Sequence, residues 1–86
     1  MAKYKIEIKK SAVKEVKQLP AKDIKKILKK IMDLGDDPHP PDSKKLSGHD
    51  RYRLRYRHYR ILYEIVEDIL IIYVVRIGHR KDIYRK

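Results

Sequence analysis

The chain has 86 residues, of which 23 are lysine or arginine and 12 are aspartate or glutamate, giving a formal net charge of +11. This length suits one small domain over residues 1–86, and the charge favours a polyanionic partner, most often nucleic acid. The sequence has no cysteine and no apolar run of the roughly 18 residues that span a membrane, and its charged N-terminus is unlike a signal peptide. We therefore expect a cytoplasmic protein without disulfides and without membrane association.

The first half of the chain has the pattern of a strand followed by two helices. Residues 3–9 alternate between apolar and charged side chains, which is the period of a half-buried strand. Ser11 is a suitable N-cap for a short helix over residues 12–19. Residues 21–34 repeat isoleucine and leucine at helical spacing with lysines between them, and Gly35 is a common helix stop. We expect the two helices to form a hairpin that packs on a sheet.

The second half has the pattern of a loop followed by three strands. Residues 36–43 contain three prolines and cannot form a helix or a central strand. Alternation predicts strands over residues 51–57 and 59–66, and the apolar run 69–77 predicts a buried central strand. The expected fold is α+β, with an N-terminal strand, a two-helix hairpin packed on a mostly antiparallel four-stranded sheet, and a short C-terminal tail.

The strand over residues 51–57 carries arginine at every second position. Because successive side chains of a strand point to opposite faces, one face is a row of guanidinium groups and the other is aromatic and aliphatic. A tight turn at residues 57–58 would place Arg55 opposite Arg60 on the next strand and Arg53 opposite Leu62. Directly opposed like charges destabilise a sheet, so a chain that keeps them is expected to bind an anion between them.

The same argument extends to the last strand. A turn centred on residues 67–68 would place Arg60 opposite Val75, and it would bring His79 onto the arginine face. The other face is then expected to be apolar and to receive the helices. Its expected members are Leu54, Ile61, Tyr63, Ile65, Leu70, Ile72 and Val74.

Four segments of the chain, in order and spacing, resemble the RelE/ParE toxin superfamily. They are Lys45-Leu46-Ser47-Gly48, Tyr52-Arg53-Leu54-Arg55, Tyr59-Arg60-Ile61-Leu62-Tyr63-Glu64-Ile65 and Gly78-His79-Arg80-Lys81-Asp82-Ile83-Tyr84. The resemblance covers essentially the whole chain and implies a RelE-like fold, similar to the microbial RNases. Its RelE branch implies a ribosome-dependent endoribonuclease that cleaves mRNA in the decoding site and is inhibited by a cognate antitoxin. Its ParE branch implies an inhibitor of DNA gyrase.

The resemblance also implies which residues form the site. Arg53 and Arg55 match the strand lysines of the RelE branch, Arg60 matches its strand arginine, and Arg80 and Tyr84 match an arginine and a tyrosine of its tail. These five matches favour RelE over ParE. Since arginine stays protonated in proteins, Arg53 and Arg55 are expected to stabilise charge and not to donate a proton.

The implied reaction is attack of a 2′-hydroxyl on the neighbouring phosphate, giving a 2′,3′-cyclic phosphate and a 5′-hydroxyl end without a metal or other cofactor. Arg53, Arg55, Arg60 and Arg80 would stabilise the developing charge. Tyr84 would act as a base or stack on a nucleobase, and His79 is a candidate acid. Further RNA contacts are expected from Lys45, Arg51, Arg57, His58 and Lys81.

Three functions remain open from the sequence. The leading one is a toxin of a type II toxin–antitoxin system that binds the ribosome and cleaves mRNA, thereby inhibiting translation. The second is a gyrase inhibitor of the ParE type. The third is a catalytically weak RNA or ribosome binder, or a co-repressor subunit, which the arginines in place of lysines would allow. Either toxin would pair with an acidic, amphipathic antitoxin.

Overall fold

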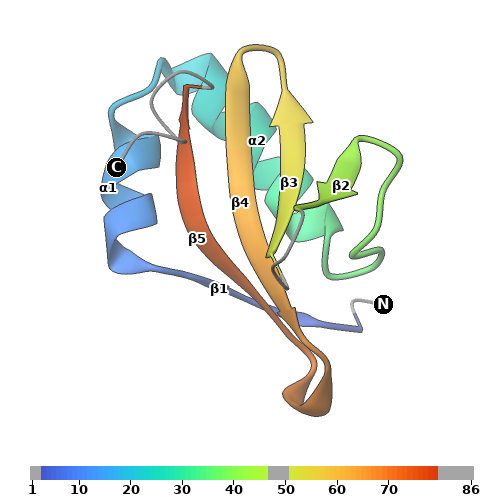
Figure 1. Cartoon of the computed structure of the whole chain (residues 1–86). Helices are drawn as coiled ribbons and strands as arrows, with labels where there is room; N and C mark the ends of the chain where they lie inside the picture. The colour runs from blue at the N-terminus through green and yellow to red at the C-terminus, as the bar shows by residue number, and fades with distance from the viewer. Residues whose placement is uncertain (1–2, 47–50, 80–86) are drawn as a thin grey trace.

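The structure, a computed structural model, describes residues 3–46 and 51–79. Its elements are β1 (Lys5–Ile8), α1 (Lys10–Lys17), α2 (Ala21–Asp33), β2 (Ser43–Lys45), β3 (Arg51–Tyr56), β4 (Tyr59–Val66), the short 3-10 helix η1 (Glu67–Ile69) and β5 (Ile71–His79). The described strands form one sheet in the order β1-β5-β4-β3-β2, in which β1 and β5 are parallel and the other pairs antiparallel. In Figure 1, α2 passes behind β3 and β4, and α1 lies next to β5.

The predicted α+β fold is confirmed, but the sheet has five strands and not four. The additional strand is β2, which pairs with β3 so that Ser43 lies opposite Leu54 and Lys44 opposite Arg53. With only three residues, β2 is too short to show an alternating pattern in the sequence. Its hydrogen bonds to β3 depend on the preceding loop returning to the edge of the sheet.

The two helices form as predicted, although the start of α1 differs. The helix begins at Lys10, after an extended Lys9 that provides no side-chain cap, so Ser11 lies inside the helix and the predicted cap was wrong. Helix α2 begins after Pro20, whose carbonyl accepts the amides of Asp23 and Ile24 at 2.9 and 3.0 Å. Neither described helix combines the length and apolar character needed to cross a membrane.

The helices bury one face of the sheet, as expected. The buried core contains Ile27 and Ile31 of α2. From the sheet it contains Leu54, Ile61, Tyr63, Ile72 and Val74. Ile65 packs against this core only in part. Leu70 was wrongly assigned to it, because Leu70 adopts a left-handed conformation (φ 54°) after η1 and is 41% exposed.

The connection from β4 to β5 is longer than predicted. A turn centred on residues 67–68 would pair residue 66 with residue 69, but η1 and Leu70 extend the connection so that Val66 pairs with Ile71. A β-bulge between Leu62 and Tyr63 then shifts the register further. A bulge places two residues of one strand against one of its partner and changes the pairing by one.

The consequence is that Arg60 lies opposite Gly78, not opposite Val75. This is a shift of three residues (78 − 75 = 3), and an odd shift exchanges the two faces of a strand. His79 therefore pairs with Tyr59, whose side chain packs against the helix-side core. The prediction that His79 shares a face with the arginines was wrong.

Candidate nucleic-acid interface

Arginines gather on the face of the sheet opposite the helices, which we call the open face. Arg53 and Arg55 project from β3 and Arg60 from β4, and we call these three residues the arginine row. Arg55 lies opposite Arg60, and Arg53 opposite Leu62, as the sequence predicted. The positions between them, Leu54 and Ile61, belong to the buried core. Alternation along two paired strands therefore concentrates positive charge on one surface.

Arg60 is the most buried member of the row, with only 5% of its surface exposed. Leu62, two residues farther along β4, forms a small apolar cluster with Val75, and Leu46 and Tyr73 extend this cluster. The Nη1 of Arg60 donates a hydrogen bond to the carbonyl oxygen of Tyr59 at 3.2 Å. Burying a cation beside a second cation is costly, so a phosphate that added charge-assisted hydrogen bonds would be strongly favoured here.

Gly78 leaves space beside Arg60. The two residues are register partners in β4 and β5. A Cβ atom placed on Gly78 would have no described atom within 4 Å, so no packing against the described residues requires glycine there. Among the described residues, Gly78 therefore leaves the backbone next to Arg60 uncovered by a side chain of its own.

A second opening adjoins Arg53 and Arg55. It is a hollow of about 260 Å³, and its lining consists of Pro41, Asp42, Ser43, Lys44, Arg53 and Arg55. The Nε of Arg53 is buried and makes no hydrogen bond to any described residue. Lys44 lies opposite Arg53 and adds a cation that the sequence analysis missed. Only recognition of β2 as a strand could have revealed it.

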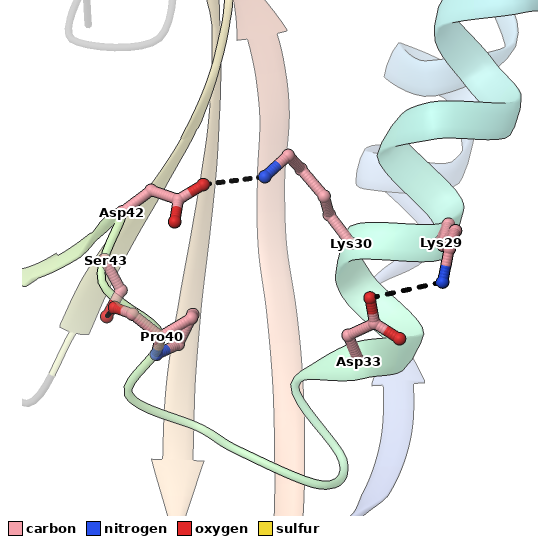
Figure 2. Close-up of polar contacts among 6 residues, drawn as sticks. All are labelled: Lys29, Lys30, Asp33, Pro40, Asp42 and Ser43. Carbon is pink, nitrogen blue, oxygen red and sulfur yellow. Dashed lines mark hydrogen bonds and ion pairs between the residues drawn. The ribbon is translucent and has the colours of Figure 1, made fainter.

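The loop that forms this hollow is tied to α2. Figure 2 shows Lys30 reaching from the helix to Asp42, where Nζ and Oδ2 are 2.7 Å apart. The hydrogen bond from Lys30, reinforced by its charge, holds the pKa of Asp42 below its ordinary value. Ser43 Oγ donates to the Pro40 carbonyl oxygen at 2.8 Å. These contacts fix the start of β2 and with it the position of Lys44.

The remaining predicted contacts on β2 and β3 differ in their surroundings. Arg51 lies opposite Glu64, and its Nε and Nη2 donate to Glu64 Oε2 at 3.3 and 2.9 Å. Its charge is therefore largely balanced within the sheet by Glu64. Lys45 is exposed on the edge strand β2. Arg80, Lys81 and Tyr84 lie outside the described residues, so their roles stay predictions.

The turn between β3 and β4 carries Arg57 and His58, both exposed. Arg57 has a positive φ of 54° although it is not glycine. The imidazole rings of His58 and His79 stack with their centroids 5.9 Å apart. Beside them the hydroxyl of Tyr59 donates to Asp23 Oδ2 at 3.0 Å, and this hydrogen bond, with some burial, raises the pKa of Tyr59.

A carboxylate from α1 supports the end of β5. Glu15 Oε2 accepts hydrogen bonds from Nε and Nη2 of Arg76 at 3.3 and 3.1 Å, while its Oε1 accepts the backbone amide of Ile77 at 3.0 Å. Glu15 thus holds in place the segment that faces Arg60. No local pattern predicts this contact, since Glu15 and Ile77 are 62 positions apart in the sequence. Within residues 3–46 and 51–79, no three histidine or carboxylate groups come together to hold a metal ion.

Comparison with known proteins agrees with this arrangement. Residues 6–84 match the family described as the ParE toxin of the type II toxin–antitoxin system parDE. A protein named toxin RelE1 from Methanocaldococcus jannaschii is 34% identical over 96% of this chain and 97% of its own length. The RelE–RelB complex of Pyrococcus horikoshii has a chain that is 28% identical, with a TM-score of 0.83 over 93% of this chain and 98% of its own.

The chain therefore belongs to the ParE toxin family of type II toxin–antitoxin systems, within the RelE/ParE superfamily. An Escherichia coli protein described as a RelE-like toxin is also 30% identical over 95% of this chain and 90% of its own length. Both of these relatives are therefore named after RelE and not after ParE. It is a RelE-like toxin component, and the resemblance found in the sequence is confirmed.

Proposed function

We propose that this toxin is a ribosome-dependent endoribonuclease that cleaves mRNA in the decoding site. The observation that carries the proposal is the Arg55–Arg60 pair, two guanidinium groups opposed across one ladder with Arg60 almost fully buried. Like charges that lie directly opposite each other repel, and an anion that binds between them relieves this repulsion. The phosphodiester of RNA is such an anion, and the net charge of +11 favours it over neutral ligands.

In the proposed reaction, the 2′-oxygen attacks the adjacent phosphorus as Tyr84, acting as the base, accepts its proton. The bond from phosphorus to the 5′-oxygen breaks, and the 5′-oxygen takes a proton from water to leave as a 5′-hydroxyl. Arg55 and Arg60 would stabilise the negative charge that grows on the phosphorane, and Arg53 with Lys44 would hold a neighbouring phosphate. Proton transfer is assigned to Tyr84, with Arg80 as a further cation, because arginine itself stays protonated. His79 is not included among these groups, because it lies on the other face of the sheet.

The same proposal includes an antitoxin as partner. The similar chains from Pyrococcus horikoshii and from Methanococcus jannaschii occur in complexes with RelB. An acidic, amphipathic antitoxin would complement the charge of this chain and could cover the arginine row. Native mass spectrometry after co-expression with the neighbouring gene should detect a stoichiometric complex. Detection of the free toxin alone would contradict this part of the proposal.

The decisive experiment adds the purified protein to a translating extract and maps new RNA 5′ ends by primer extension. We expect cuts inside the reading frame that require ribosomes. Arg60→Ala should abolish most of them, whereas Lys25→Ala, which removes an exposed cation of α2, should cut like the wild type. Ribosome binding without cuts would instead support the weak RNA binder or co-repressor.

A second candidate function is inhibition of DNA gyrase. The match of residues 6–84 to the ParE toxin family favours it. A supercoiling assay with purified gyrase distinguishes the two functions, because a gyrase inhibitor should stall supercoiling and leave RNA in a translating extract intact. We expect that supercoiling continues and that RNA in the translating extract is cut.

A further inference from the structure

The end of the sheet next to the β3–β4 turn has a row of aromatic rings on its helix-side face. Tyr56, Tyr59 and His79 are consecutive register partners across β3, β4 and β5. The rings of Tyr56 and Tyr59 are nearly parallel, with centroids 6.4 Å apart and planes at 13°. His79 meets Tyr59 edge-on at 6.3 Å, and His58 stacks on His79 at 5.9 Å and 18°. We call these four residues the aromatic end.

The inner rings of the aromatic end are fixed and the outer rings are accessible. Tyr56 and Tyr59 pack against the core, and Tyr59 is anchored by its hydrogen bond to Asp23, which is itself only 7% exposed. His58 and His79 are both exposed. Two aromatic rings that stack on each other in solvent, on a rigid support, present a π surface that water solvates poorly.

Positive charge surrounds this surface. The guanidinium carbon of Arg57 lies 5.8 Å from the ring centroid of Tyr56, within range of a cation–π contact. Arg55 and Arg60 directly adjoin Tyr56 and Tyr59 in sequence but project to the open face. The same end of the sheet therefore offers cations on one face, π surfaces on the other, and an arginine at the turn between them.

We propose that the aromatic end stacks an unpaired nucleobase of single-stranded RNA, with His58 and His79 as the contacting rings, while the arginine row on the other face holds a phosphate farther along the same strand. The inference rests on the proposed function insofar as RNA is the ligand of the arginine row. Single-stranded nucleic acid is commonly bound in this manner, by a basic track that follows the backbone and aromatic side chains on which bases stack. Stacking tolerates any base, because every base has a π face.

The positions of His58 and His79 suit stacking on a base better than contact with the phosphate or binding of a metal ion. From the helix-side face, His79 is turned away from a phosphate held between Arg55 and Arg60. The pair lacks a third ligand within the described residues, so a metal site is not indicated. A base, in contrast, needs only an accessible ring and a nearby cation to hold its phosphate.

The test measures binding of a short single-stranded RNA that carries 2-aminopurine at one position and 2′-O-methyl groups throughout, which prevent cleavage. The double variant His58→Ala/His79→Ala should bind about tenfold more weakly and lose the fluorescence quenching that stacking causes. Its dependence on salt should match the wild type, because the phosphate contacts remain. The variant His58→Trp/His79→Phe should restore both affinity and quenching.

An abasic oligonucleotide and Arg55→Ala provide the matched controls. The wild type should bind the abasic strand as weakly as the double variant binds the intact strand, and the double variant should not distinguish the two strands. Arg55→Ala should weaken both strands by the same factor and make the salt dependence shallower. Equal binding of the intact strand by the wild type and the double variant would overturn the inference.

Cleavage in a translating extract separates this inference from the proposed function. If the wild type binds the intact strand more tightly than the abasic strand but never cuts RNA, the stacking inference is supported and the nuclease function is overturned. If it cuts RNA on ribosomes but binds both strands equally, the nuclease function is supported and the stacking inference is overturned. Circular dichroism of the double variant should match the wild type, since both imidazoles are exposed.

Discussion

The two ends of the β3–β4 hairpin carry the same residue type in opposite circumstances. At one end Arg51 faces Glu64 and forms an ion pair, with Nη2 2.9 Å from Oε2, and nearby Tyr4 donates to Glu67 at 2.9 Å. At the other end Arg55 faces Arg60, a pair of like charges, and Arg60 is buried. Arg51 and Arg55 occupy equivalent places in the alternation of β3. Under the proposed function, the first end contributes stability and the second, which we call the anion-binding end, holds a phosphate of the RNA.

Replacing the arginine at each end should give the largest difference between the two ends, in cleavage rate and in stability. Arg60→Ala should lower the rate of mRNA cleavage by about 10²- to 10³-fold, because a cation aimed at the developing phosphorane charge is lost. Arg51→Ala should leave the rate within about threefold and lower the free energy of unfolding by less than about 1 kcal/mol, since its ion pair is half-exposed. Cleavage rates from primer extension and urea unfolding of both variants provide the test. Similar rates in the two variants would contradict the assignment.

The second effect concerns the support of the anion-binding end by Glu15. Glu15→Ala would leave the amide of Ile77 without its acceptor, and Ile77 is fully buried. An unsatisfied buried donor costs about 1–3 kcal/mol, so the free energy of unfolding should fall by that amount. Glu15→Gln keeps a carbonyl oxygen for the amide and should lose less than half as much. If urea unfolding shows equal losses, the ion pair with Arg76 is the important contact.

The third effect lies between the two ends, at Tyr63. Burial raises the pKa of Tyr63 to about 12, above its ordinary 10.0. Between pH 10 and 12 the unfolded chain therefore loses this proton before the folded protein does. The stabilisation is complete below pH 10 and is lost as the pH rises towards 12, by up to about 2 kcal/mol.

Tyr63→Phe should remove this part of the pH dependence. The variant loses the hydrogen bond from the hydroxyl to the Pro38 carbonyl oxygen, which is 2.7 Å long, so it should be less stable at neutral pH. Its free energy of unfolding should fall less steeply between pH 10 and 12 than that of the wild type. Urea unfolding at intervals of pH tests the slope, and an unchanged slope would refute the expectation.

The smallest effect is expected at the turn that closes the anion-binding end. Arg57 has φ 54°, a left-handed conformation that costs a side-chain-bearing residue about 1 kcal/mol and glycine almost nothing. Arg57→Gly should raise the thermal midpoint, whereas Arg57→Ala keeps the Cβ atom and should not. Both variants should bind RNA more weakly to the same extent, because both lose one cation. A midpoint that rises equally in both would point to relief of charge repulsion and not of backbone strain.

Much of the fold followed from periodicity and turn chemistry. The alternation of residues 51–57 correctly separated the open face from the core, and the turn at residues 57–58 correctly paired Arg55 with Arg60. The apolar spacing of residues 21–34 correctly located α2. Each of these features is local, since side chains alternate along a strand and repeat along a helix whatever surrounds them. The family resemblance could be recognised for the same reason, because it rests on short segments in order.

Other features depended on residues far apart in the chain. The three residues of β2 pair with β3 where the preceding loop returns to the sheet, and the contact from Lys30 to Asp42 helps to hold that loop. The bulge between β4 and β5, in which Val75 of β5 is the extra residue, and the extended connection between these strands moved Gly78 opposite Arg60 and turned His79 to the helix side. Neither has a local periodic signal. Packing of β5 against α1 and β1 decides which register is satisfied, and one additional residue in a ladder reverses the face of every residue beyond it.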